Sequence, residues 1–297
     1  MSGTLASNRY GKSRIRLVKV CRRAEQGRGT TGSGDAAPHD IIDLTIDIQL
    51  EGDFEPVYTD GDNRTCLPTD TMKNTVYAFA RRDAVADVET FAAKLADHFA
   101  AKPGVTRARI CASQAPWNRI PVAGRPHPHA FVRAGSEEWT ATVTRDRDGL
   151  DIASGVTNLV VLKTTDSAFA RYPRDEYTTL PETRDRILAT SITAMWTYRR
   201  GTTDFTVRQR IRSALVETFA MHESESVQHT LYAMAEAALA AADDITDVTL
   251  TLPNRHHLLV DLTPFGLDNP NEIFVATDQP FGLIEATVRR SRGDSRP

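Results

Sequence analysis

Apolar and polar residues alternate in two stretches near the start of the chain. Residues 41–50 (IIDLTIDIQL) alternate throughout, and residues 14–20 set Ile15 and Leu17 between charged side chains. A period of two predicts strands that bury one face. Residues 24–38, which lie between them, are rich in Gly, Thr and Ser, so we predict a flexible loop that joins the two strands as a β-hairpin.

Helical spacing replaces this alternation in the next part of the chain. Apolar residues recur every three or four positions in 69–82 and in 87–101, which predicts two helices with one apolar face each. Pro103-Gly104 ends the second helix. Further strands are predicted at 105–114, 129–133 and 139–145.

The second half repeats this order of elements. Strands are predicted at 149–154, 159–164 and 187–199, helices at 205–222 and 227–241, and strands at 245–252, 256–262 and 272–276. The order predicts a duplicated ββααββ unit, although no repeat is visible residue by residue. We therefore expect an α+β fold, an antiparallel sheet with helices on one face, in two domains of 1–148 and 149–297.

Composition narrows the class of protein. The chain has 297 residues, 40% of them hydrophobic and 25% charged, as in globular proteins. Its net charge of −3 offers no basic field for nucleic acid. No apolar run approaches the ~18–20 residues that span a bilayer, so we expect no membrane partner. The ends show no signal peptide and no peroxisomal tripeptide, and Cys21, Cys66 and Cys111 suit a reducing interior, so we expect a cytoplasmic protein.

Candidate chemistry begins at the start of the helix predicted at 69–82. Thr69 and Asp70 follow Pro68, and hydroxyl and carboxylate groups at such a position commonly cap a helix. The positive end of the helix dipole also favours anions and preorganised polar groups. From these residues alone, an ordinary cap and a functional site both remain open.

Longer motifs favour the functional site. Residues 58–63 (YTDGDN) and 69–77 (TDTMKNTVY) resemble the urate oxidase (uricase) family, and so do other motifs along residues 10–284. They are Tyr10-Gly11-Lys12, LKTTDSAF at 162–169, PRDEYTTLPETRDRILAT at 173–190, Ser226-Val227-Gln228 and LPNRH at 252–256. The resemblance implies two tunnelling-fold (T-fold) units in tandem, and a homotetramer that closes its sheets into a barrel with active sites at subunit interfaces.

The resemblance also implies a reaction and its residues. Urate would be oxidised by dioxygen and water to 5-hydroxyisourate and hydrogen peroxide, with no cofactor and no metal. A proton relay would be formed by Lys12, Thr69 and His256. Substrate binding would fall to Thr69, Asp70, Phe169, Arg186, Val227, Gln228 and Asn254.

Several of these side chains suit a flat purine anion on their own chemistry. The guanidinium of Arg186 pairs two acceptors in one plane, the amide of Gln228 both donates and accepts, and Phe169 stacks on a ring. Each also has an ordinary explanation. Arg186 has Asp185 beside it for an ion pair, Gln228 is typical of a helix start, and Phe169 suits a loop anchor.

The relay residues have the same two explanations. Thr is a weak base that needs a neighbouring base, and a desolvated Lys12 or a titrating His256 meets that need. Asn254 offers polar groups for a water or dioxygen. A solvated lysine, a structural histidine and an Asn in a Pro-Asn turn are the ordinary explanations of these residues.

Two other kinds of protein remain possible from the residues alone. A zinc-dependent T-fold cyclohydrolase needs clustered Cys and His ligands, and only His127 and His129, in a Pro-rich segment that predicts a turn, come near this pattern. A non-catalytic purine-binding protein would keep the fold and lose the relay. No GxGxxG, Walker or HExxH motif occurs in the chain.

Overall fold

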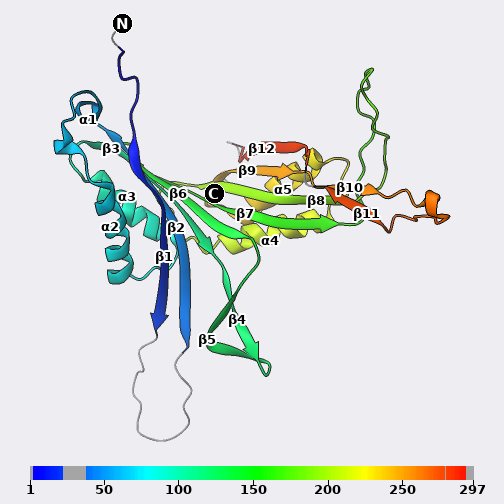
Figure 1. The fold of residues 1–297 in the computed structure, drawn as a ribbon, viewed down its shortest axis with the longest axis horizontal. Helices are drawn as coiled ribbons and strands as arrows, with labels where there is room; N and C mark the ends of the chain where they lie inside the picture. Colours follow the sequence, from blue (N-terminus) through cyan, green and yellow to red (C-terminus); the bar gives the residue numbers. More distant parts are fainter. Residues whose placement is uncertain (1–2, 23–37, 278, 292–297) are drawn as a thin grey trace, which may run out of the picture. The chain divides into compact units, whose positions relative to one another are not determined.

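Two compact units make up the chain, Met1–Ser154 and Gly155–Pro297. The computed structural model describes residues 3–22, 38–277 and 279–291, and Figure 1 shows their helices and strands. Almost all of the predicted loop at 24–38 lies outside the described residues. The assignment of 1–148 and 149–297 as T-fold units stays a prediction.

The first unit is built on an antiparallel sheet with the order β1-β2-β3-β6. Helix α2 lies against β1, and α3 lies against β3 and β6 (Figure 1). The alternation predicted for 41–50 holds, because Leu44, Ile46, Ile48 and Leu50 of β2 are fully buried. The elements of this sheet and its helices are β1 (Tyr10–Arg22), β2 (His39–Gly52), α1 (Glu55–Thr59), η1 (Asn63–Thr65), α2 (Thr69–Arg82), α3 (Val88–Ala100), β3 (Val105–Ala115) and β6 (Glu138–Asp146).

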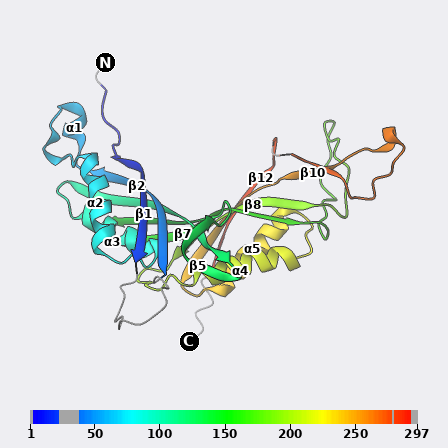
Figure 2. The same ribbon diagram turned by 60° about the horizontal axis from the view of Figure 1, so that its bottom comes forward.

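The second unit repeats strands and paired helices. Strands β8, β9 and β12 are antiparallel neighbours, α5 packs on β9 and β12, and α4 lies beside α5 (Figure 2). A two-stranded ribbon, β10–β11, follows β9. The bounds are β7 (Gly149–Lys163), which crosses from one unit to the other, β8 (Leu188–Tyr198), α4 (Arg208–Met221), α5 (Val227–Ala241), β9 (Ile245–Pro253), β10 (His256–Leu259), η2 (Thr263–Phe265), β11 (Phe274–Thr277) and β12 (Leu283–Arg289).

The predicted class, α+β with a large antiparallel sheet, is confirmed, but three details were wrong. The strands predicted at 149–154 and 159–164 are one strand, β7, which continues through Asn158 at a φ of 57°. Residues 125–129, predicted as a turn, begin β5 (Arg125–Arg133), which pairs with the unpredicted β4 (Trp117–Val122) in a separate ribbon. A two-stranded ribbon tolerates prolines because its strands have a free edge. Strand β12 was also not predicted.

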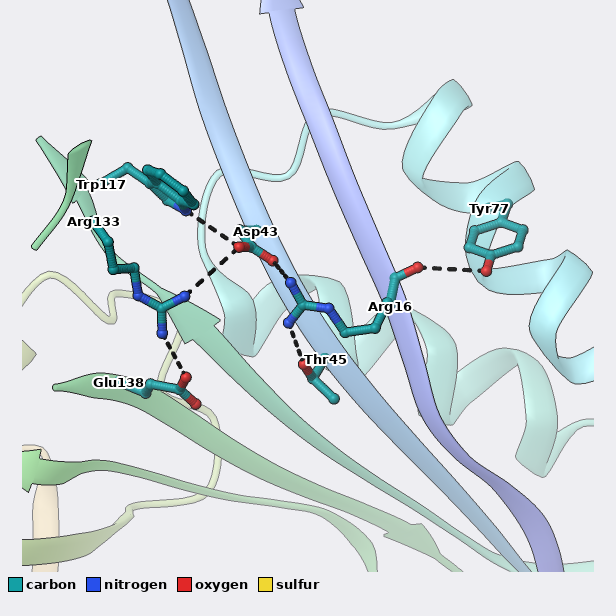
Figure 3. Close-up of polar contacts among 7 residues, drawn as sticks. All are labelled: Arg16, Asp43, Thr45, Tyr77, Trp117, Arg133 and Glu138. Atoms are coloured by element: carbon teal, nitrogen blue, oxygen red, sulfur yellow. Dashed lines mark hydrogen bonds and ion pairs between the residues drawn. The ribbon is translucent and has the colours of Figure 1, made fainter. Parts of the chain in front are cut away.

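A buried carboxylate ties this ribbon to the sheet. Asp43 of β2 is 3% exposed and accepts a hydrogen bond from Trp117 Nε1 at 3.2 Å. Its carboxylate is also paired with Arg16 of β1 and lies 3.9 Å from Arg133 Nη1 (Figure 3). Because a buried charge is costly unless it is paired, this cluster holds β4 and β5 against the sheet of the first unit. No helix in the described ranges is long and apolar enough to cross a membrane.

Candidate active site

A cavity of about 520 Å³ lies in the second unit. Its wall is formed by the segment that follows β7, the residues before β8, and the β9–β10 junction. Four of the residues predicted for the site line it together: Phe169, Arg186, Asn254 and His256. The fold therefore brings together residues that are up to 87 positions apart in the sequence.

Arg186 lines this cavity, together with the carboxylates of Glu182 and Asp185. Its Cζ lies 5.3 Å from the centroid of the Phe169 ring. Its Nε is buried and has no hydrogen-bond partner among the described residues, and burial lowers the pKa of the guanidinium. The neighbouring Asp185 carboxylate instead accepts the Thr165 hydroxyl at 3.0 Å. A planar cation with an unused donor suits an anionic, planar ligand.

Phe169 is held from two sides. Its backbone N–H donates to the Thr183 carbonyl at 2.8 Å, and the Thr183 N–H donates back at 3.0 Å. The ring of Tyr172 stacks on it, with centroids 4.8 Å apart and planes at 18°. Tyr172 was missed in the sequence analysis, where two aromatics three residues apart in a polar segment were the available signal. The stack leaves Phe169 half-buried at the cavity wall.

Asn254 and His256 are fixed by the backbone around them. The Asn254 N–H donates to the Gly282 carbonyl at 2.8 Å, and the Arg255 N–H donates to the Ala189 carbonyl at 2.9 Å. His256 opens β10 opposite Thr277 of β11. An amide and an imidazole are thus presented to the cavity from a braced strand end.

Val227 and Gln228 are not among the lining residues of this cavity. They begin α5, where Val227 is buried and Gln228 is exposed, and the Ser226 hydroxyl caps the helix by accepting the His229 N–H at 3.1 Å. The start of α5 is nevertheless connected to the cavity wall. The Ala168 N–H, next to Phe169, donates to the carbonyl of Ser224, which lies shortly before α5, at 2.7 Å.

The other predicted site residues, Lys12, Thr69 and Asp70, belong to the first unit. Thr69 is the first residue of α2, but the N-cap is Pro68 and no side chain caps the helix, so the ordinary cap that the sequence had left open does not form. The Asp70 carboxylate turns instead to Lys73 Nζ at 2.5 Å and Asn74 Nδ2 at 2.8 Å. The half-buried Thr69 hydroxyl forms no hydrogen bond with the described residues, which leaves it available to a ligand.

Lys12 is half-buried on β1. The pKa of Asp70 lies below its usual value, chiefly through the hydrogen bond from Lys73 and, as the smallest contribution, through the charge of Lys12. The Lys12 ammonium is therefore within electrostatic reach of the first turn of α2.

The candidate zinc ligands His127 and His129 are not joined by a third ligand in the described residues. The rings of His127 and His129 lie 4.5 Å apart on β5. Within the described ranges, no group of three or more His, Cys, Asp or Glu side chains is placed to hold a metal ion.

Comparison with known proteins identifies the family. The family model for uricase matches residues 8–144 and 152–285. The chain belongs to the uricase family. Uricases are urate oxidases, so the chain is an oxidoreductase that acts on urate with dioxygen as acceptor. This assignment excludes the cyclohydrolase and the non-catalytic protein that the residues alone had left open.

Individual uricases agree along nearly the whole chain. The uricase of Arthrobacter globiformis is 46% identical, over 98% of this chain and 92% of its own. That of Aspergillus flavus is 36% identical, over 95% and 96%. The crystal structure of the Arthrobacter globiformis uricase covers 100% of this chain and 98% of its own, with a TM-score of 0.89 at 44% identity.

Proposed function

We propose that the chain converts urate, dioxygen and water to 5-hydroxyisourate and hydrogen peroxide, with neither a metal nor an organic cofactor. The observation that best supports this is the cavity of the second unit, where the half-buried Arg186 has a buried, unused Nε and lies beside the ring of Phe169. Urate is a flat anion with several carbonyl oxygens, so it offers the guanidinium of Arg186 both a negative charge and acceptors in one plane.

Binding and proton transfer share only Thr69 in this proposal and otherwise fall to different residues. Arg186 pairs urate oxygens in the ring plane, and Phe169 stacks on the purine. Gln228 and the backbone of Val227 bind the opposite edge. Asn254 holds the dioxygen or water above the ring.

The relay removes protons from bound urate. Thr69 passes a proton between the substrate and Lys12, and His256 extends the relay, because a hydroxyl needs an adjacent base to act. The electron-rich urate then gives two electrons to dioxygen, which leaves as hydrogen peroxide with two protons. Water adds to the oxidised purine to give 5-hydroxyisourate, so the substrate itself is the reductant.

The site requires more than one chain in this proposal. Lys12, Thr69 and Asp70 belong to the first unit, and the other candidate residues belong to the second. We propose a cytoplasmic homotetramer of tandem T-fold units, in which each active site combines the first unit of one subunit with the second unit of another.

Urate turnover by metal-depleted protein tests the proposal. We expect urate absorbance to fall while one hydrogen peroxide is released per urate. Full activity after dialysis against a chelator supports cofactor independence. Activity that disappears with the metal and returns when it is restored contradicts it.

A further inference from the structure

The pairing of β1 with β2 contains a bulge next to Lys12. Lys12 lies opposite Ile48, whereas Ile15 lies opposite Ile46. Ser13 and Arg14 of β1 therefore both face the single residue Asp47 of β2. One extra residue in a strand reverses which side chains point to which face.

Because of the bulge, even-numbered side chains before it and odd-numbered side chains after it lie on the same face of β1. Tyr10 and Lys12 are even-numbered, and they pair with Leu50 and Ile48 on the buried face of β2. Beyond the bulge the odd-numbered residues take over this face. Ile15 is 3% exposed, and Lys19 Nζ donates to the Ala80 carbonyl of α2 at 2.7 Å.

A regular strand would give Lys12 a different position. It would share a face with Val18 and Val20, which are 55% and 44% exposed and lie on the face of β1 opposite to Ile15 and Lys19. The bulge thus decides whether the Lys12 ammonium is near the start of α2, where Thr69 lies.

Asp47 holds the bulge in place. Its Oδ1 accepts the Arg14 N–H at 2.7 Å. Arg14 has a φ of 56°, a conformation that residues other than Gly, Asn and Asp rarely adopt, so the bulge needs support from its surroundings. The carboxylate provides that support from the opposite face of β2.

Tyr10 ties the start of α2 to the same strand. Its hydroxyl accepts the Leu67 N–H at 2.8 Å, two residues before Thr69, and its ring packs edge-on against Phe54 with centroids 4.9 Å apart. The strand that carries Lys12 and the segment that leads to Thr69 are therefore joined by one hydroxyl.

We propose that Asp47 and Tyr10 are positioning residues for the proton relay: Asp47 keeps Lys12 on the α2 face through the bulge, and Tyr10 keeps Thr69 beside it. This inference rests on the proposed function, because it assigns the bulge a role in that reaction. Neither residue touches the substrate in the proposed site.

Steady-state kinetics of Asp47→Ala, Asp47→Asn and Tyr10→Phe test it. We expect Asp47→Ala and Tyr10→Phe to lower kcat by about tenfold or more, since small displacements of reacting groups are costly. The affinity for xanthine, which lacks the 8-oxo group of urate, should change less than about twofold because the binding residues are untouched. Asp47→Asn keeps a side-chain oxygen for the Arg14 N–H and should retain most of the rate.

Arg14→Gly provides a matched control and a rescue. Glycine adopts a positive φ without strain, so this variant should keep the bulge and the parent kcat. The double variant Asp47→Ala/Arg14→Gly should recover part of the rate that Asp47→Ala loses. A folded Asp47→Ala enzyme with the parent kcat overturns the proposal, and so does an equal loss in kcat and xanthine affinity.

Acylation of Lys12 separates failure of the inference from failure of the proposed function. With a soluble active ester and peptide mass spectrometry, Lys12 should react faster in Asp47→Ala than in the parent, because it turns toward solvent. Unchanged reactivity overturns the role of the bulge whatever the enzyme does. A parent protein that leaves urate unoxidised overturns the proposed function, while the labelling result still stands.

Discussion

Arg186 is a half-buried cation whose Nε is buried and lacks a hydrogen-bond partner in the described part of the chain. Such a group is costly in the free protein and useful only when a ligand pairs with it. We expect Arg186→Met to weaken xanthine binding about 100-fold, measured by calorimetry, and to raise Tm by about 2 °C. Arg186→Lys, the control that keeps the charge, should bind weakly without the gain in Tm. A lower Tm in Arg186→Met would mean that the guanidinium stabilises the free protein.

Thr69 has a hydroxyl that no described residue uses. In the proposed relay this hydroxyl transfers a proton but contributes little to binding. We expect Thr69→Ala to lower kcat about 100-fold or more while xanthine affinity stays within about threefold. Thr69→Ser keeps the hydroxyl and should retain most of the rate. Unchanged turnover by Thr69→Ala would remove Thr69 from the relay.

At the scale of elements, Tyr10 links β1 to the start of α2, and the partial burial of its hydroxyl should make the folded state sensitive to alkaline pH. Burial first, and the nearby Cys66 second, raise the pKa of Tyr10 to about 12. In the unfolded chain a tyrosine ionises near pH 10. The folded state therefore binds this proton more tightly, so the stability it contributes is complete below pH 10 and is lost as pH rises toward 12.

Tyr10→Phe should remove this part of the alkaline loss. Urea unfolding of the parent at pH 8 and pH 11 should show a larger drop in unfolding free energy than the same experiment on Tyr10→Phe. An equal drop in both proteins would mean that other groups account for the alkaline loss.

Gly11 allows β1 to approach β2 closely beside the bulge. A Cβ at this position would lie 1.8 Å from the Ile48 carbonyl oxygen, so the backbone would have to move. We expect Gly11→Ala to lower the free energy of unfolding by about 3 kcal/mol, measured by urea unfolding. Gly61→Ala, a control at a positive φ with open space around its Cβ position, should cost less. The reverse order would mean that β1 adapts readily beside Lys12.

Periodicity predicted elements well where one face is buried. The alternation of 41–50 identified β2, and helical spacing gave α2 its bounds of 69–82. Periodicity failed where strand pairing occurs despite residues that disfavour strands, as at Pro126 and Pro128 in β5. The bulge is reflected in the sequence, because Lys12 is even-numbered and Ile15 odd-numbered although both lie on the same face of one strand. Only the register of β1 against β2 shows that an extra residue opposite Asp47 causes this change.

The candidate residues were predicted from motifs, but their environments were not. A motif selects Arg186, yet its contact with Phe169 and its unpaired Nε arise from packing between segments that are distant in sequence. The cap considered for Thr69 and Asp70 does not form, because Pro68 occupies the N-cap position and the Asp70 carboxylate binds Lys73 and Asn74, one turn further along α2. The family predicted from these motifs is confirmed, and its match extends over both units.

At the scale of the whole molecule, the proposal divides one active site between two subunits. Mixing two inactive variants tests this division. Thr69→Ala lacks a residue of the first unit and Arg186→Met lacks a residue of the second. If sites form between subunits related by a two-fold axis, each mixed pair contains one intact site and one that lacks both residues.

Refolding the two variants together in equal amounts should therefore restore about a quarter of the parent activity, since about half of random pairs are mixed and half of their sites are intact. Each variant refolded alone should stay inactive, and so should a mixture of the separately refolded proteins assayed at once. Diluting the parent until it is a monomer should abolish turnover, because the subunits separate. Analytical ultracentrifugation measures the oligomeric state at each dilution. If each chain instead holds a complete site, co-refolding restores nothing and the dilute monomer keeps its full rate.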